Sequence, residues 1–279
     1  TAAAPTTLYD LFDYWNPADT TMDDDPNFSL MSMRCGGDDD DDVKYGVDYH
    51  HGSSVAVDPT TSDYVVTLRN LNTIAAFKRD GSGLRWTLSS SLASNFTFAT
   101  DEMKFYDPHD VTVWAPSSDS PGSNDFTTIT VVDDGNSRPG CDWDDASKSG
   151  CFSRALEYVL DTETMTARVL WQFEFPQNLQ VSGLKQAESF DVFNEVGGSV
   201  TKLTTGSGSQ EFLVSLTAVY NDDESDASDD GYLAYVYQVD TEGDAGAWMA
   251  LPALPSWATA GRYRVVPRSS VYGESEHCP

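Results

Sequence analysis

Three of the four histidines in this chain lie just before or at the start of a strand-like run, and two of them could share a pocket with an arginine. His50 and His51 come just before a strand-like run, and His109 lies at the start of another. Arg138 follows a third run of the same kind. Imidazole and guanidinium groups donate hydrogen bonds to anions, so His51, His109 and Arg138 predict a site for a tetrahedral oxyanion. His50 is expected to point to the opposite side from His51.

Such a pocket would oppose the charge of the rest of the molecule. Lysine and arginine number 16, aspartate and glutamate number 45, and the formal net charge is −29. A surface this acidic repels nucleic acid and anionic lipid, so neither is expected as a partner. No apolar run approaches the length of a membrane span.

The acidic residues are clustered rather than spread. Runs of like charge repel one another and are typical of solvated loops. None has the spaced Asp-x-Asp-x-Asp-Gly pattern of an EF-hand, so two interpretations remain: solubility, or an irregular calcium site. No other cofactor is expected. The acidic loops lie at residues 22–25, 38–42, 142–145 and 222–230.

Cysteines and glycosylation sequons both favour a secreted, extracellular or lumenal protein. The four cysteines lack the Cys-x-x-Cys spacing of zinc sites, and their even number suits two disulfides. We expect the pairs Cys141–Cys151 and Cys35–Cys278. Asn27 and Asn95 each begin an Asn-x-Ser/Thr sequon. The first five residues, Thr-Ala-Ala-Ala-Pro, are typical of a processed or cropped start.

The chain is predicted to be all-β. Its regular segments are rich in β-branched and aromatic residues and are separated by Gly, Asp, Asn, Ser and Pro. Apart from a short turn near Thr7 to Tyr14, none has a helical period with caps. The expected strands include residues 64–68, 127–132, 155–160, 212–216 and 232–239.

A weak internal repeat indicates a more specific fold. Asp80, Asp161 and Asp240 each start a turn between two strands, at a nearly constant spacing, and a tryptophan follows on the second strand. The three tryptophans, which we expect to pack between sheets rather than to bind a ligand, are Trp86, Trp171 and Trp248. Regular strand–turn–strand units at long period predict a β-propeller of four-stranded blades. Coincidence among common hairpins is the alternative.

The repeat period allows only three to four blades in the chain. We therefore expect one propeller domain over residues 1–279, with the ring either small or completed by another chain, because an open array would leave sheet edges exposed. The segment Leu8 to Trp15 resembles the outer strand of a blade that begins upstream.

Several motifs follow one another along the chain. They begin with a histidine-led strand, continue through a strand ending in arginine with an asparagine soon after, and include Pro-His-Asp and Asp-Asp-Gly-x-x-Arg segments. Their residues are His51 to Asp58, Asp63 to Ile74, Gly83 to Leu88, Pro108 to Asp110, Val132 to Arg138, Ser153 to Asp161 and Tyr263 to Pro267. In this order the motifs resemble the arylsulfotransferase family of β-propellers.

This resemblance implies a six-bladed type of propeller and a sulfuryl transfer that needs no nucleotide donor. A phenolic sulfate ester gives its sulfuryl group to a histidine, and a second phenol then takes it. On this reading His51 and His109 hold the sulfuryl oxygens and Arg138 clamps them, which suits their chemistry.

The chain departs from the family pattern at two places. Ser53-Ser54 stands where Asn-Ser is usual, and the nucleophilic histidine of a later blade has no counterpart between His109 and His277. The corresponding region offers Ser182, Lys185 and Ser189 instead.

Two functions therefore remain open. One is sulfuryl transfer with His51 or His109 as the nucleophile. The other is a non-catalytic extracellular propeller, a structural or binding component of a glycoprotein assembly, in which His51, His109 and Arg138 serve only the fold.

Overall fold

The computed structural model describes residues 7–15, 31–35, 44–115, 126–141, 150–175, 177–179, 190–191, 197–204, 210–219 and 233–251. The chain forms two compact units, residues 1–174 and 175–279, and each is described by itself. The regular elements of the described residues are β-strands, apart from three single-turn 3-10 helices at Leu11–Asp13, Arg69–Leu71 and Asp101–Met103. The prediction of an all-β protein is confirmed.

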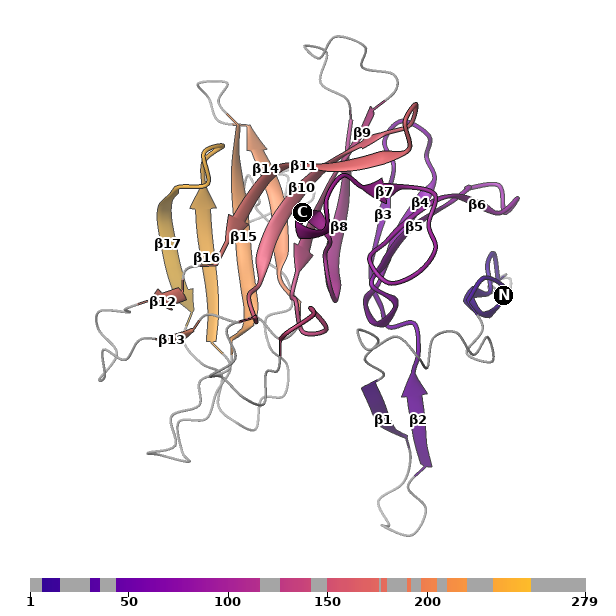
Figure 1. Ribbon diagram of the computed structural model, residues 1–279, viewed down its shortest axis with the longest axis horizontal. Helices are drawn as coiled ribbons and strands as arrows, with labels where there is room; N and C mark the ends of the chain where they lie inside the picture. The colour runs from indigo at the N-terminus through magenta and orange to yellow at the C-terminus, as the bar shows by residue number, and fades with distance from the viewer. Residues whose placement is uncertain are drawn as a thin grey trace, which may run out of the picture. The chain divides into compact units, whose positions relative to one another are not determined.

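The first four-stranded sheet is an antiparallel meander in which each strand pairs with the next along the chain (Figure 1). Its two central strands, Tyr64–Leu68 and Thr73–Phe77, contain many β-branched and aromatic residues, which favour a buried β-strand. The strands are β3 (Gly52–Val57), β4 (Tyr64–Leu68), β5 (Thr73–Phe77) and β6 (Leu84–Ser89).

The second sheet of this unit has the order β7-β11-β10-β9-β8. Strands β8 to β11 form another antiparallel meander, and the short β7 joins β11 in parallel. The strands are β7 (Thr97–Phe98), β8 (Pro108–Trp114), β9 (Phe126–Asp133), β10 (Arg154–Asp161) and β11 (Thr166–Glu174).

The two sheets pack together through one apolar core. Ile74 and Trp86 come from the first sheet, and Ile129, Leu156 and Tyr158 come from the second. Packing of two sheet faces in this way removes apolar surface from water, and each Å² removed stabilises the folded state by about 25 cal/mol.

Strand β3 lies beside β8, the first strand of the second meander. Ser53 and Ser54, which stand where the family has Asn-Ser, connect the two strands. Ser53 Oγ donates to the carbonyl of Pro108 at 2.9 Å, and Val111 N–H donates to Ser54 Oγ at 2.9 Å. The two serines therefore tie the starts of β3 and β8.

The remaining strands form a third meander and two hairpins. The third meander, in the second unit, has the order β14-β15-β16-β17. Its strands are β14 (Ser199–Thr204), β15 (Gln210–Val219), β16 (Leu233–Val239) and β17 (Ala245–Leu251). The hairpins are β1 (Met31–Cys35) with β2 (Lys44–Asp48) and β12 (Gln177–Leu179) with β13 (Phe190–Asp191).

The three predicted strand–turn–strand repeats are present as hairpins β5–β6, β10–β11 and β16–β17. In each turn the aspartate accepts backbone N–H groups two or more residues ahead, for example Ser82 N–H to Asp80 and Glu163 N–H to Asp161. Asp240 does the same for Glu242. This side-chain bonding explains why aspartate starts each turn.

The expectation of an outer strand at Leu8 to Trp15 is wrong. This segment contains the 3-10 helix Leu11–Asp13, capped by Asp10, whose side chain accepts the Phe12 N–H. Its aromatic residues cover part of the first sheet instead. Tyr9 and Trp15 contact Phe77, with ring centroids 4.6 and 6.3 Å apart.

Several expected features lie outside the described residues. They include the four acidic loops, Asn27 and Cys278, so the Cys35–Cys278 pair and a calcium site stay predictions. The single domain over residues 1–279 also stays a prediction. No helix in the described part of the chain is long and apolar enough to cross a membrane.

Candidate functional site

The candidate site lies at one end of the two meanders of the first unit, where the predicted His51 and His109 are joined by residues that were not predicted. His51 directly precedes β3, and Arg69 directly follows β4. In the second sheet, Asp107 directly precedes β8 and Asp133 ends β9. Because neighbouring strands are antiparallel, the start of one strand and the end of the next lie at the same end of the sheet. The topology therefore gathers these residues.

The structure brings His51 and His109 together. Their ring centroids are 6.2 Å apart with an interplanar angle of 76°. His109 is completely buried, whereas His51 is half-buried. His50 faces elsewhere: its Nε2 lies 3.1 Å from the carbonyl oxygen of Trp15, and its ring packs edge-on against Phe12. The predicted difference between His50 and His51 is thus confirmed.

Two oxygen atoms surround Nδ1 of His109. The carboxylate Oδ2 of Asp134 lies 2.7 Å away, and the carbonyl oxygen of Asp107 lies 3.2 Å away. Asp134 is itself completely buried. Its own carbonyl accepts a hydrogen bond from Ser153 Oγ at 2.8 Å, which ties it to the chain just before β10.

Asp107 connects the loops that carry the site. Its N–H donates to Asn72 Oδ1 at 2.6 Å, and its Oδ2 accepts from both N–H and Oγ of Ser137 at 2.7 Å. Its Oδ1 lies 3.6 Å from Nη1 of Arg69. Arg69 N–H in turn donates to the carbonyl of His51 at 2.9 Å. This buried polar network fixes the two histidine-bearing loops relative to each other.

The backbone of the site occupies an unusual conformation. Of the described non-glycine residues, six have positive φ, and four of those lie here: His51 (45°), Asn72 (47°), Asp107 (52°) and Asp110 (55°). Each such residue costs of order 1–3 kcal/mol and persists because its surroundings hold it. Sequence gives little sign of this strain, apart from the ability of Asn and Asp to adopt it.

Arg138 lies beside this network but does not contact either imidazole. Its Nη2 donates to Oδ2 of Asp133 at 2.7 Å, and its guanidinium carbon lies 3.8 Å from the centroid of the Phe152 ring. Asp133 Oδ2 also accepts from Nε of Arg154 at 2.8 Å. The neighbouring Ser137 belongs to the Asp107 network, so Arg138 stands at the rim of the site.

Burial and neighbouring charges shift the pKa values of two groups near Arg138, the Tyr106 phenol and the Arg154 guanidinium. Burial raises the pKa of the Tyr106 phenol, over whose ring the guanidinium lies at 5.1 Å. Burial opposes the charge of Arg154, but Asp133, Tyr158 and Glu174 together outweigh burial and raise the pKa of that guanidinium. Both phenol and guanidinium therefore keep their protons.

The disulfide Cys141–Cys151, confirmed by the structure, closes the loop next to Arg138. Cys141 N–H donates to the carbonyl of Arg138 at 2.9 Å, and Phe152 follows Cys151 directly. The disulfide is therefore connected to the Arg138 backbone through Cys141 and to the Phe152 ring beside the guanidinium through Cys151.

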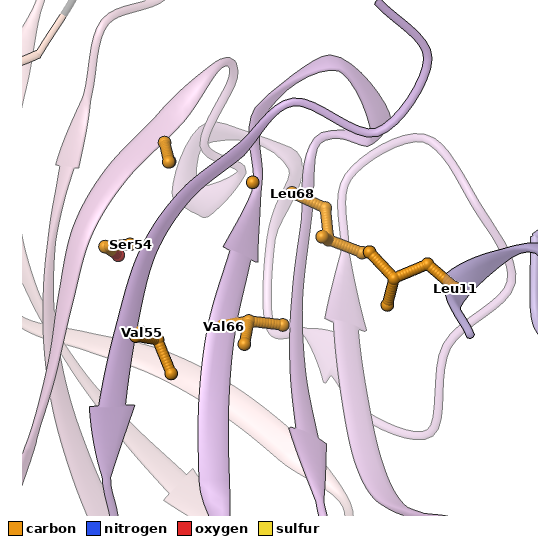
Figure 2. A pocket seen from close by; sticks show the side chains of 7 residues that line it. Leu11, Ser54, Val55, Val66 and Leu68 are labelled. Carbon is orange, nitrogen blue, oxygen red and sulfur yellow. The ribbon is translucent and has the colours of Figure 1, made fainter. Parts of the chain in front are cut away.

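A small apolar pocket adjoins the first residues of β3 (Figure 2). It has a volume of about 390 Å³. Leu11, Val55, Val66 and Leu68 supply its side chains, together with Gly52 to Ser54. Val55 and Val57 on the same strand are 65% and 51% exposed, so this part of the sheet face is open.

The sequence prediction missed four members of the site. They lie inside or beside the motifs that contain the histidines, but an amino-acid type alone does not reveal which residues a side chain contacts. The four are Arg69, Asn72, Asp107 and Asp134. Among the described residues, no group of three or more His, Cys, Asp or Glu side chains is arranged to hold a metal ion.

Comparison with known proteins gives one family. No curated protein sequence matches the chain significantly. The family described as arylsulfotransferase (ASST) matches residues 5–180, which is more than half of the chain and includes every residue of the site above. The chain therefore belongs to the arylsulfotransferase family.

Proposed function

We propose that the protein transfers a sulfuryl group from a phenolic sulfate ester to a phenol acceptor. The observation that carries this proposal is the facing pair His51 and His109, held at one end of two sheets by a buried network. Membership of the arylsulfotransferase family supports this reaction class and phenolic small molecules as substrates.

The chemistry suits a neutral imidazole. A ring nitrogen attacks sulfur, an N–S bond forms, and the S–O bond to the first phenol breaks as a phenolate leaves with the electron pair. The oxygen of the second phenol then attacks sulfur, the N–S bond breaks, and the imidazole regains its lone pair. Solvent supplies and accepts the phenolic protons. The transfer requires no cofactor.

His51 is the better candidate for the attacking nitrogen. It is half-buried, whereas His109 is completely buried, so a solute meets His51 first. His109, whose ring centroid lies 6.2 Å from that of His51, would stabilise charge on the sulfuryl oxygens. This assignment replaces the family nucleophile, which has no counterpart here between His109 and His277.

Arg138 is proposed to clamp the sulfuryl group from the rim. Nη2 is engaged by Asp133, while Nε is buried and has no hydrogen-bond partner among the described residues. Its planar fork could hold sulfate oxygens through the remaining donors.

We further propose that the three meanders are blades of a six-bladed type of propeller, of which this chain supplies three to four. The regular hairpins and the adjacent first strands β3 and β8 support this arrangement. The open face at Val55 and Val57 supports a second protein chain that completes the ring.

The proposed location is extracellular, lumenal or periplasmic. The disulfide Cys141–Cys151 favours an oxidising compartment, since such bonds are rare where thiols are kept reduced.

A non-catalytic role is the second candidate, and one observation favours it. Asp134 and Asp133 already face His109 and Arg138, so the fold supplies its own carboxylate partners for these two side chains. In that case the protein would be a structural or binding component of an extracellular glycoprotein assembly.

Turnover of an aryl sulfate that releases a coloured phenol, with a second phenol as acceptor, tests the proposal. Wild-type protein should release the coloured phenol, and His109→Ala should lower the rate of that release about 10²-fold or more. His50→Ala is the matched control, because His50 contacts Trp15 rather than the site, and it should retain activity. Absence of turnover in wild-type protein supplied with its partner chain would favour the non-catalytic role.

A further inference from the structure

The surroundings of Nδ1 in His109 restrict where the ring can carry its proton. Its two near neighbours are Asp134 Oδ2 at 2.7 Å and the Asp107 carbonyl oxygen at 3.2 Å. A carbonyl oxygen accepts hydrogen bonds and cannot donate, and the same holds for an ionised carboxylate. A bare lone pair on Nδ1 would therefore face two more lone pairs inside the protein.

Burial makes such an arrangement costly. His109 and Asp134 are both completely buried, so water cannot relieve repulsion between their lone pairs. A proton on Nδ1 donates a hydrogen bond to the Asp107 carbonyl and places positive charge, instead of a lone pair, 2.7 Å from the Asp134 carboxylate. Nε2 then holds the lone pair of the neutral ring, and it is the nitrogen that takes up the second proton when the ring becomes charged.

The two acceptors are themselves held in place. The Asp107 backbone is fixed by its N–H bond to Asn72 and by Ser137, which binds its carboxylate through two hydrogen bonds. Ser153 Oγ holds the Asp134 carbonyl. The geometry around Nδ1 is thus built by residues from both sheets of the unit.

We propose that Asp134 is a positioning residue that holds His109 in the Nδ1–H tautomer. The inference rests on the proposed function in one respect: in sulfuryl transfer it directs Nε2, and never Nδ1, towards the reacting groups. The Asp134 carboxylate also stabilises positive charge that develops on the imidazole ring as Nε2 binds a sulfuryl oxygen through a proton.

Nitrogen-15 NMR of protein labelled at histidine tests the tautomer directly. Four histidines give few signals, and His109→Gln identifies the one that matters. Wild-type protein at neutral to basic pH should show the proton of His109 on Nδ1. A proton on Nε2 with a bare Nδ1 would overturn the proposal.

Asp134→Asn is the informative variant, since its amide can also donate to the ring. We expect the Nε2–H tautomer to become populated. Asp58→Asn is a matched control, because Asp58 is another buried aspartate, which accepts from Thr60 N–H at a turn between β3 and β4. This control should leave the His109 signals unchanged. A His109 tautomer unaffected by Asp134→Asn would contradict the role of Asp134.

Kinetics separate this inference from the proposed function. For Asp134→Asn we expect kcat to fall about 10- to 100-fold with KM nearly unchanged, and the pH profile of kcat to change shape. Asp134→Glu, which keeps the charge, should recover part of the loss. If wild-type protein shows the Nδ1–H tautomer but no turnover, the function fails while the tautomer stands. The opposite result is also informative. If wild-type protein converts the aryl sulfate, and Asp134→Asn has the same His109 tautomer, kcat and pH profile as wild type, the positioning role fails while the function stands.

A second inference concerns Asn95, and it rests on a separate observation. Asn95 is exposed and begins the sequon Asn95-Phe96-Thr97. Its Oδ1 accepts from the N–H of Thr87 at 3.0 Å and from Thr87 Oγ1 at 3.2 Å. The Asn95 N–H donates back to Thr87 Oγ1 at 3.1 Å. Because a backbone N–H can only donate, the oxygen of the amide must face Thr87.

We propose that Asn95 Nδ2, directed away from β6 by this arrangement, carries an N-linked glycan. A bond forms between Nδ2 and the anomeric carbon of a sugar attached to a lipid diphosphate; Nδ2 loses a proton and the lipid diphosphate leaves. The folded protein accommodates the glycan because Asn95 is exposed and lies beside β6, the last strand of the first sheet.

Peptide mapping of protein secreted from eukaryotic cells tests this inference. The peptide with Asn95 should carry a glycan that a peptide-N-glycosidase removes. Thr97→Ala should abolish the modification, while Thr97→Ser, which preserves the sequon, should retain it. An unmodified Asn95 in secreted, folded protein would overturn the proposal.

Discussion

At the scale of single residues, the site depends on carboxylates that organise the histidines. Asp107 and Asp134 supply the oxygen atoms around His109, and Asp107 reaches the His51 loop through Arg69. Both carboxylates are buried, and Asp107 has a positive φ of 52°. An acidic chain thus uses its aspartates to place the few imidazoles that it has.

A buried aspartate away from the site gives a prediction on acid stability. Burial acts to raise the pKa of Asp63, but hydrogen bonds from Arg85, from the Arg79 N–H and from Thr61 outweigh burial and lower it. A lowered folded pKa means that this stabilisation is complete above the unfolded value of about 4 and is lost as pH falls through the folded pKa.

Asp63→Asn should therefore lower the free energy of unfolding by about 1–2 kcal/mol at pH 7, a modest value because the Arg85 side chain is 43% exposed. The difference from wild type should shrink as pH falls below about 4. Urea unfolding at pH 7 and at pH 3 checks it. A difference that stays constant with pH would contradict the assignment.

The histidine pair could be predicted from sequence, whereas its supporting residues could not. His51 and His109 each lie at the start of a strand, and antiparallel meanders bring such ends together. Which of the many aspartates faces His109 depends on the positive φ at Asp107 and on tertiary packing. Arg138 was placed in the same pocket by motif order, but its guanidinium binds Asp133.

At the scale of elements, the loop between β9 and β10 joins the arginine to the fold. Gly135, with φ +82°, makes the turn after β9, and the Cys141–Cys151 bond closes the loop ahead of β10. The backbone at Gly135 approaches Phe152 so closely that an added Cβ would lie 2.3 Å from its carbonyl oxygen.

Two glycines of this loop form a matched pair of variants. Gly140 also has positive φ, +86°, but an added Cβ there would meet nothing within 4 Å. We expect Gly140→Ala to cost about 1–2 kcal/mol from backbone strain alone. Gly135→Ala should cost more, since Phe152 must also move, and should reduce activity because Phe152 packs on Arg138. Thermal unfolding of both variants checks the order; equal costs would contradict it.

Removal of the disulfide is a second test at this scale. Replacement of Cys141 and Cys151 by serine should lower stability by about 2–3 kcal/mol, as expected for a loop with a sequence separation of 10. Thermal unfolding checks it, with wild-type protein under reducing conditions as the comparison. A variant as stable as oxidised wild type would show that the cross-link does not hold this loop.

Turn chemistry made the hairpins predictable, and the same reasoning failed at the N-terminal segment. Asp80, Asp161 and Asp240 each bond to the backbone ahead, a local interaction that sequence reveals. The run Leu8 to Trp15 has the apolar and aromatic content of a strand, but it packs against residues of β4, β5 and β6 instead of pairing with a strand. Composition indicates burial and does not by itself indicate pairing.

At the scale of the whole molecule, charge and closure decide what the protein binds. The net charge of −29 opposes the approach of anions, so the proposed phenolic sulfate needs cationic groups at a local site. The exposed side chains of Val55 and Val57 mark the part of the first unit that the proposed second chain would cover.

Calcium binding by the acidic loops is a prediction of this scale. If the loops hold the ion in the folded state, a chelator should lower the melting temperature, because ligands that bind only the folded state stabilise it. Differential scanning fluorimetry with and without chelator measures the effect. An unchanged melting temperature would assign the loops to solubility alone.

Sulfuryl transfer between two phenols is the claim on which the account depends, and mass spectrometry of the small molecules tests it most directly. Wild-type protein, incubated with an aryl sulfate and a second phenol, should yield the sulfate ester of the second phenol in amounts equal to the first phenol released. The double variant His51→Ala/His109→Ala should yield neither product. Failure of wild-type protein to form the new ester, or equal formation by the double variant, would contradict the account.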